Sequence, residues 1–144
     1  MVQGMERDTA TLARDYGLVV GAEGEVAALE AVGSGPLTLA NLFALHPEAR
    51  YDDGTTCSGV EAMLRYSAVS GDRLSAVGGR FVSQALPTGT IWGEDDPWDV
   101  LVVAEYPSVD AFWSLLADPE YRTAYVHRAA AVVRQRVTVG IPLS

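Results

Sequence analysis

The stretch that decides the fold is Leu37-Thr-Leu-Ala-Asn-Leu-Phe-Ala-Leu45, a nearly continuous apolar run that one polar residue, Asn41, interrupts. A second run, Val100-Leu-Val-Val-Ala104, is apolar without interruption. Short apolar runs bounded by turn residues are typical of strands that are buried on both faces. The two stretches therefore predict two central strands of a sheet that is covered on both sides.

Amphipathic helices are predicted after each of these strands. Ser58 begins the first helix and forms a capping box with Glu61, three residues later. Ser108 begins the second helix, and Asp118-Pro119 restarts it, with Asp as the cap and Pro in the first turn. We therefore expect helices over 58–74, 108–118 and 118–133.

Shorter strands are predicted over 80–86 and 89–92, separated by Pro87, and a last strand over 134–141. The resulting order β-α-β-β-α-β follows shorter helical stretches near the N-terminus. This order is the split βαβ pattern of ferredoxin-like α+β folds. We assign residues 1–34 to an N-terminal helical extension and residues 35–144 to the ferredoxin-like domain.

Both helices of such a fold cover the same face of the sheet, which leaves the other face bare. The runs 37–45 and 100–104 are apolar on both faces, and a soluble monomer does not expose an apolar sheet face of that size. The simplest remedy is a symmetric homodimer that packs sheet against sheet, a dimeric α/β barrel. We also expect a ligand-sized cavity between each sheet and its helices.

Composition excludes several classes of protein. The chain of 144 residues carries a net charge of -9, and its ten basic residues are all arginines scattered along it. Nucleic acid binding needs a clustered basic surface, so we expect no such partner. The sequence has no run of about eighteen apolar residues, so it predicts no membrane span. The single cysteine, Cys57, and a charged, poorly apolar N-terminus favour a cytoplasmic protein.

A family resemblance extends over residues 25–143. Its residues, in order, are Gly35-Pro36, Asn41-Leu42-Phe43, Tyr51, Ser58-Gly59, Glu61-Ala62, Tyr66, Gly78-Gly79, Trp98-Asp99, Tyr106-Pro107-Ser108, Ala111-Phe112, Asp118-Pro119-Glu120-Tyr121 and His127-Arg128. The set resembles uncharacterised dimeric α/β-barrel proteins catalogued as a domain of unknown function. They share a broad fold group with antibiotic-biosynthesis monooxygenases and small polyketide cyclases. The resemblance implies the dimeric barrel and no particular reaction.

Asn41 is the most informative polar residue because it interrupts an apolar strand. A buried amide must be hydrogen-bonded, since otherwise its burial costs free energy. One interpretation is a core amide bonded to neighbouring backbone. The other is a group that orients a ligand in the cavity, beside Phe43 on the same strand.

His127 and Arg128 lie near the end of the second helix. An imidazole can act as a general base near neutral pH, and a guanidinium can hold a carboxylate or enolate oxygen. Both cations could instead complement the helix dipole. Tyr121 and Tyr125 share a helix face with Arg128 at spacings of four and three, so this face either lines a pocket or packs with its polar tips in water.

Three further candidates have a structural alternative each. Tyr66 could point its hydroxyl into the cavity from the first helix. Trp98 could contact a ligand, although covering the sheet edge is the simpler role. Glu105 would be a buried base with a raised pKa if it pointed inward, whereas an outward Glu105 would pair with an arginine.

Signatures of common cofactor sites are absent from the sequence. It has no phosphate-binding G-x-x-x-x-G-K, no G-x-G-x-x-G and no G-x-S-x-G. Two distant histidines, His46 and His127, with one cysteine give poor support for a metal site. We expect no cofactor and no metal.

These observations favour a cofactor-independent enzyme of specialised metabolism that cyclises or isomerises a small, partly apolar organic molecule. In this hypothesis Asn41 and Arg128 polarise a carbonyl oxygen, and His127 or Tyr66 moves a proton. A cofactor-free monooxygenase of the same fold group is one alternative. A non-catalytic module that binds a small molecule or a partner is another.

Overall fold

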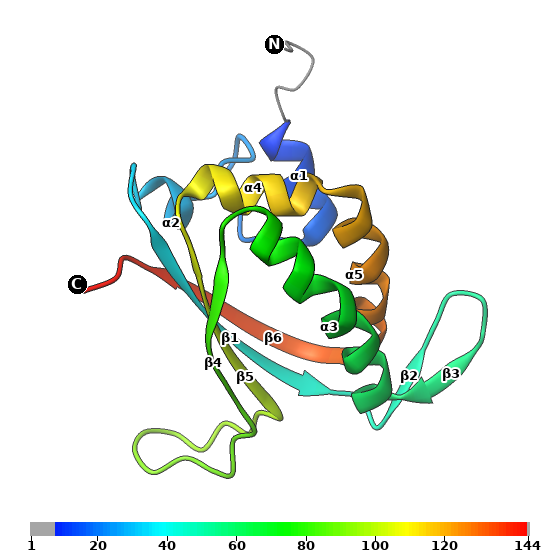
Figure 1. Ribbon diagram of the computed structural model, residues 1–144. Helices are drawn as coiled ribbons and strands as arrows, with labels where there is room; N and C mark the ends of the chain where they lie inside the picture. The colour runs from blue at the N-terminus through cyan, green and yellow to red at the C-terminus, as the bar shows by residue number, and fades with distance from the viewer. Residues whose placement is uncertain (1–7, 144) are drawn as a thin grey trace.

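The computed structural model describes residues 8–143, with the helices gathered on one side of an antiparallel sheet (Figure 1). Residues 1–7, the start of the assigned extension, and residue 144 lie outside this range. The elements are α1 (Thr9–Tyr16), α2 (Ala27–Glu30), β1 (Leu37–Leu45), β2 (Glu48–Arg50), β3 (Thr56–Ser58), α3 (Gly59–Ala76), β4 (Arg80–Ala85), β5 (Val100–Tyr106), α4 (Val109–Ala117), α5 (Pro119–Ala131) and β6 (Val132–Gly140).

The main sheet has four strands in the order β4-β5-β1-β6, and every neighbouring pair is antiparallel. With α3 after β1 and α4–α5 after β5, this is the predicted ferredoxin-like α+β fold. The two apolar runs occupy the two central strands. Asn41 stands at the centre of the sheet, opposite Val102 of β5 on one side and Val137 of β6 on the other.

Strand β1 turns alternate side chains to opposite faces of the sheet. Leu37, Leu39, Asn41 and Phe43 are buried on the helix side. The intervening side chains of β1 are only partly buried and lie on the face that no helix covers. The strand register therefore decides that Asn41 points toward the helices.

The predicted helix caps are confirmed. The hydroxyl of Ser58 accepts a hydrogen bond from the Glu61 amide at 3.0 Å, and Ser108 accepts one from the Ala111 amide at 3.1 Å. The Asp118 carboxylate accepts from the Glu120 amide at 2.8 Å. Each bond satisfies an amide that lacks an intrahelical partner, so these boundaries depend on residues close in sequence.

Two segments differ from the sequence-based expectation. Residues 89–92 form no strand and lie in the loop between β4 and β5, where Ile91 and Trp92 are each 88% exposed. The pairing of β4 with β5 ends at Ala85, opposite Leu101, so residues 89–92 lie beyond the last paired residue of β4. The small hairpin β2–β3 lies between the first predicted strand and the helix that begins at Ser58, where the sequence predicts no strand.

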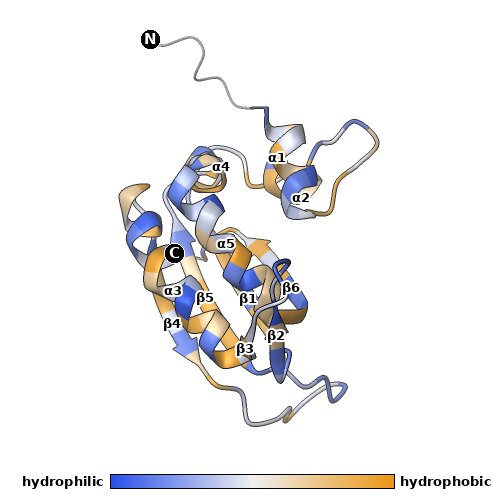
Figure 2. Cartoon of the chain, turned by 90° about the vertical axis from the view of Figure 1, so that its right-hand side faces the viewer, coloured by the Kyte–Doolittle hydropathy of each residue, from blue (hydrophilic) through white to orange (hydrophobic). Residues whose placement is uncertain are grey.

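Helices α1 and α2 pack at one end of the helical layer, beyond α4 (Figures 1 and 2). Leu12, Ala13 and Leu29 belong to the same hydrophobic cluster as β1 and α4. The Tyr16 hydroxyl donates a hydrogen bond of 2.7 Å to the carbonyl of Leu116. The N-terminal helices are thus joined to the core of the domain.

Gly59, the first residue of α3, lies against the backbone that follows β1. A Cβ atom at Gly59 would be 1.9 Å from the carbonyl oxygen of His46, and backbone cannot move aside as a side-chain tip can. Gly59→Ala should therefore lower the free energy of unfolding in urea by about 2–3 kcal/mol. Gly89→Ala, where a Cβ would meet nothing within 4 Å, is the control and should change it by less than about 0.5 kcal/mol. Equal effects of the two substitutions would contradict the close approach.

Candidate functional site

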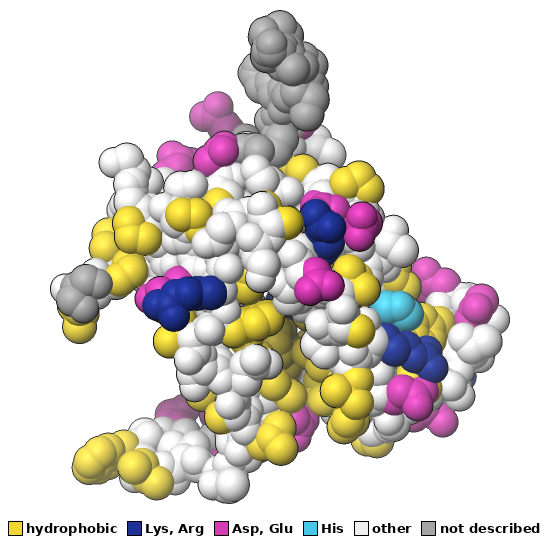
Figure 3. All heavy atoms as spheres, in the orientation of Figure 1, with side chains coloured by type: hydrophobic (Ala, Val, Ile, Leu, Met, Phe, Trp, Pro, Cys, Tyr) yellow, Lys and Arg dark blue, Asp and Glu magenta, His cyan; other side chains and the backbone are white. Residues whose placement is uncertain are grey.

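A cavity of about 790 Å³ lies between the sheet and α3, α4 and α5. This volume is within the range of small-molecule sites. Most of the wall is apolar, and Figure 3 shows hydrophobic side chains lining a hollow between β4 and α3. The apolar lining includes Leu39, Phe43, Leu74, Phe81, Val102 and Leu115.

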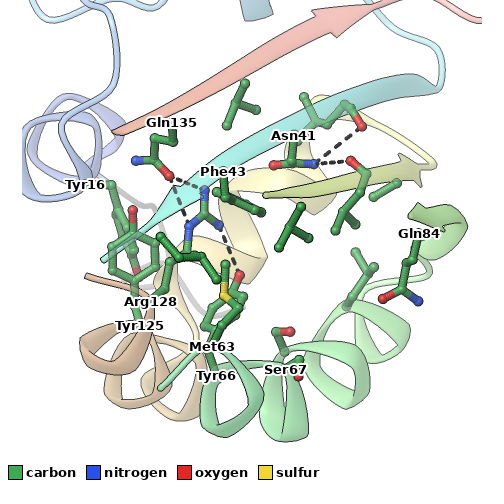
Figure 4. A pocket seen from close by; sticks show the side chains of 18 of the residues that line it. Tyr16, Asn41, Phe43, Met63, Tyr66, Ser67, Gln84, Tyr125, Arg128 and Gln135 are labelled. Carbon is green, nitrogen blue, oxygen red and sulfur yellow. Dashed lines mark hydrogen bonds between the residues drawn. The ribbon is translucent and has the colours of Figure 1, made fainter. Parts of the chain in front are cut away.

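Arg128 reaches into this cavity from α5, toward β6 and α3 (Figure 4). Its Nε and Nη2 atoms donate to Gln135 Oε1 at 3.2 and 2.8 Å, and Nη1 donates to the Tyr66 hydroxyl at 3.1 Å. The guanidinium carbon lies 4.6 Å from the ring centre of Phe43 and 5.1 Å from that of Tyr125. Aromatic faces and neutral oxygens therefore surround this cation.

Arg128 forms no salt bridge with any carboxylate in the described range 8–143. Arginines elsewhere behave differently: Arg73 pairs with Asp118 at 2.8 Å and Arg80 with Glu105 at 2.7 Å. The contrast is notable because the chain carries a net charge of -9. The cavity therefore contains a positive charge that an anionic ligand group could balance.

Burial disfavours the charged form of Arg128, but the oxygens of Tyr66 and Tyr121 outweigh that effect. The pKa of Arg128 therefore lies above its ordinary value, and the guanidinium stays charged. Burial also raises the pKa of Tyr121. Burial likewise raises the pKa of Tyr106, whose ring lines the same cavity. Both phenols are consequently protonated, hydrogen-bond-donating groups at neutral pH.

Two tyrosine hydroxyls meet beside the cation. The Tyr66 and Tyr121 oxygens are 2.7 Å apart, and Arg128 Nη1 donates to Tyr66 at 3.1 Å and to Tyr121 at 3.5 Å. One hydroxyl hydrogen is sufficient for the bond between them. The hydrogen of the other hydroxyl has no acceptor among residues 8–143. This hydrogen remains available to a ligand, and the neighbouring guanidinium polarises it.

Asn41 supplies a polar group of the opposite kind. Its amide nitrogen donates to the carbonyl of Val102 at 3.0 Å and approaches that of Leu39 at 3.5 Å. Figure 4 shows its oxygen on the other side, toward Phe43. Because the nitrogen already faces backbone carbonyls, Asn41 cannot polarise a substrate carbonyl as expected from the sequence. It offers the cavity an acceptor.

Six of the predicted site residues line this one cavity: Asn41, Phe43, Tyr66, Tyr121, Tyr125 and Arg128. His127 is not among them. Successive helix residues point about 100° apart, and the His127 ring turns away from the cavity to accept or donate a 2.7 Å bond with the Tyr51 hydroxyl. The expected convergence of His127, Arg128 and Asn41 therefore does not occur, and His127 is no candidate base for this cavity.

Trp98 and Glu105 also lie outside the cavity lining. The Arg134 guanidinium lies 3.9 Å from the ring centre of Trp98. Glu105 pairs with Arg80 at 2.7 Å, which is the structural alternative recognised in the sequence. In β5 it alternates with Ala104 and Tyr106, which face the helices, so the strand period places Glu105 on the opposite face.

Sequence reasoning missed several polar members of the cavity wall, among them Gln135, Tyr106 and Ser70. The sequence could have indicated Gln135, because it alternates with Val137 and Val139 along β6 and so lies on the same, inward face of the strand. Ser70 is 5% exposed and Tyr106 is 7% exposed. Their helix and strand were predicted, but only the packing of α3 over the sheet brings them to one space.

No set of three or more His, Cys, Asp or Glu side chains within residues 8–143 is arranged to hold a metal ion. Over the same range, no helix has the length and apolar character needed to cross a membrane.

Comparison with protein families identifies a match over residues 55–140 to a domain of unknown function (DUF1330). The chain belongs to this family. The RPA0582 protein of unknown function from Rhodopseudomonas palustris is 39% identical, with a TM-score of 0.73 over 82% of this chain and 91% of that chain. Its methylated form gives a TM-score of 0.75.

A more distant structural relative is a dabb family protein with a ferredoxin-like fold from Mesorhizobium loti. It is 18% identical, with a TM-score of 0.50 over 76% of this chain and 99% of that chain. This match shows a shared fold alone. Comparison with curated proteins finds no match, so the site must be interpreted from its own geometry.

The one-sided bonding of Asn41 has a consequence for stability. A buried acceptor without a donor costs about 1–3 kcal/mol, and Leu matches the apolar neighbours of Asn41. Asn41→Leu should therefore raise the melting temperature by roughly 2–4 °C, measured by calorimetry without ligand. Asn41→Ala, which removes the amide but leaves a void, should lower it. A lower melting temperature for Asn41→Leu would show that the amide stabilises the empty protein.

Proposed function

We propose that this chain is a cofactor-independent enzyme that stabilises an enolate-type oxygen on a small, mainly apolar carbonyl compound. Isomerisation and cyclisation are reactions that pass through such an oxygen. The observation that carries the proposal is the uncompensated Arg128 guanidinium beside two tyrosine hydroxyls, one of which keeps a free hydrogen. An apolar wall around these groups makes their electrostatic effect stronger than in water.

The chemistry of this constellation follows from its hydrogen bonds. A substrate carbonyl oxygen at the polar end would accept the free tyrosine hydrogen. Asp99 and His46, which line the same cavity, are the groups available to take an α-proton from the substrate. As that proton leaves, negative charge develops on the carbonyl oxygen, and Arg128 stabilises it through the Tyr66 and Tyr121 hydroxyls. A single well-placed donor of this kind contributes on the order of 10²–10³ in rate.

Substrate positioning comes from the same elements. Gln135 of β6 accepts two bonds from Arg128, which fixes the plane of the guanidinium. Phe43, at 4.6 Å from the guanidinium carbon, covers one face of it. The cation is therefore pre-oriented before a ligand enters, and little reorganisation is required during reaction.

A coloured phenol tests this oxyanion site. 4-Nitrophenol ionises near neutral pH, and its anion absorbs where the neutral form does not. If the site stabilises an oxyanion, bound 4-nitrophenol should ionise at lower pH than free 4-nitrophenol, as measured by spectrophotometric titration. A purely apolar pocket would have the reverse effect, because it favours the neutral form.

Variants assign the effect to particular groups. Tyr66→Phe should reduce the shift in the ionisation of 4-nitrophenol, and Arg128→Met should abolish or reverse it. His127→Gln is the control, since His127 adjoins Arg128 in sequence but does not line the cavity. Ionisation of the bound phenol at higher pH in the unmodified protein would refute the oxyanion site.

We also propose that the chain works as a homodimer with sheet packed against sheet. The face opposite the helices carries Leu42 of β1 and Leu101 and Val103 of β5 at neighbouring register positions. These side chains are partly exposed in one copy. The Arg80–Glu105 pair borders this apolar centre. A second copy would remove the centre from water at a gain of about 25 cal/mol per Å² of apolar surface.

Light scattering after size-exclusion chromatography tests the dimer. At micromolar concentration we expect about twice the chain mass of 15.3 kDa. Leu42→Arg should shift the protein to monomer, because it places a charge in the proposed contact. Val126→Arg, on an exposed part of α5, should leave the dimer intact. A strictly monomeric unmodified chain would exclude this arrangement.

A further inference from the structure

The buried oxygen of Asn41 defines a second polar requirement of the cavity. We infer that the substrate carries a hydroxyl or N–H group that donates a hydrogen bond to the Asn41 oxygen. This group is in addition to the carbonyl oxygen that the tyrosines would bind. This inference rests on the proposed function, because it concerns the same cavity. It narrows the substrate to a small hydroxy- or amino-substituted carbonyl compound with a mainly apolar skeleton.

The orientation of the Asn41 amide follows from its surroundings. Its nitrogen lies 3.0 Å from the Val102 carbonyl oxygen and 3.5 Å from that of Leu39. Carbonyl oxygens only accept hydrogen bonds, so the reversed amide would place acceptor against acceptor. The oxygen of Asn41 therefore points away from these carbonyls, toward Phe43 of the cavity wall, as drawn in Figure 4.

No donor from residues 8–143 reaches that oxygen. Asn41 is 8% exposed, and its strand neighbours Val102 and Val137 are apolar side chains of the cavity wall. A structural core amide normally uses both its nitrogen and its oxygen. Asn41 uses its nitrogen to hold a fixed orientation and leaves the oxygen directed at the space that a ligand would fill.

The two polar requirements are chemically different. At the Arg128 end the cavity donates hydrogens, through the free tyrosine hydroxyl and the guanidinium. At the Asn41 end the cavity instead accepts a hydrogen bond, through the amide oxygen. A ligand with a carbonyl oxygen alone would leave the Asn41 oxygen unpaired, whereas a ligand with a second, donating group would satisfy both ends. Sites built in this way discriminate strongly, because the wrong ligand leaves a buried polar group unpaired.

Matched naphthols test the requirement without knowledge of the natural substrate. The probes are 2,6-, 2,7-, 1,6- and 1,7-dihydroxynaphthalene, each compared with the compound in which the second hydroxyl is a methoxy group. A methoxy group has no hydrogen to donate. We expect at least one dihydroxy isomer to bind about fivefold to tenfold more tightly than its methoxy counterpart, measured by isothermal titration calorimetry.

Three variants show which residue accepts the donor. Asn41→Leu should reduce the preference for hydroxyl over methoxy to about 1. Asn41→Asp should keep the preference at a pH at which its carboxyl is protonated, because the carboxyl OH can then donate to the Val102 carbonyl and the other oxygen remains an acceptor. Gln84→Leu removes a different amide from the cavity wall and should also keep it. A preference that survives in Asn41→Leu, or that is lost in Gln84→Leu, would overturn the assignment to Asn41.

The outcomes separate this inference from the proposed function. If 4-nitrophenol ionises at lower pH when bound but no dihydroxy isomer is preferred over its methoxy counterpart, the oxyanion site stands and the inference is wrong. If neither 4-nitrophenol nor any naphthol binds, both are wrong. Should Asn41→Leu fail to fold, the comparison of hydroxyl with methoxy probes in the unmodified protein and in Asn41→Asp still decides the question.

Discussion

The Arg128 guanidinium is the interaction on which the rest of the site depends. It lies on α5, bonds to Gln135 of β6 and Tyr66 of α3, and lies over Phe43 of β1. One side chain thus connects two helices with two strands across the cavity. A carboxylate in the same place would neutralise it and leave nothing to attract a ligand oxygen. The neutral partners hold the cation in place and preserve its charge.

Several polar groups of the cavity lower the stability of the empty protein, because part of their hydrogen-bonding capacity is unused. Asn41 interrupts the central strand with a one-sided amide, and the two tyrosine hydroxyls retain a hydrogen that no described residue accepts. An apolar core of the same shape would be more stable. Departures of this kind from good core design are expected at functional sites, and here they are all directed into one space.

The two faces of the sheet have separate roles, because successive side chains of a strand point to opposite faces. The helix side of β1 and β5 carries the cavity, with Asn41, Phe43 and Val102 in its wall. The opposite side carries Leu42 and Val103 in the proposed dimer contact.

Local chemistry explains what the sequence by itself determined. Caps at Ser58 and Asp118 join residues two or three apart, and the apolar run 37–45 is a strand for reasons contained within it. Arg128, by contrast, meets a tyrosine 62 residues away. The register of β1 against β5 decides that Asn41 points toward the helices and Glu105 away from them. The orientation of α5 about its own axis decides that Arg128 lines the cavity and His127 does not. The elements were readable from near neighbours, whereas the site required long-range packing that no local pattern encodes.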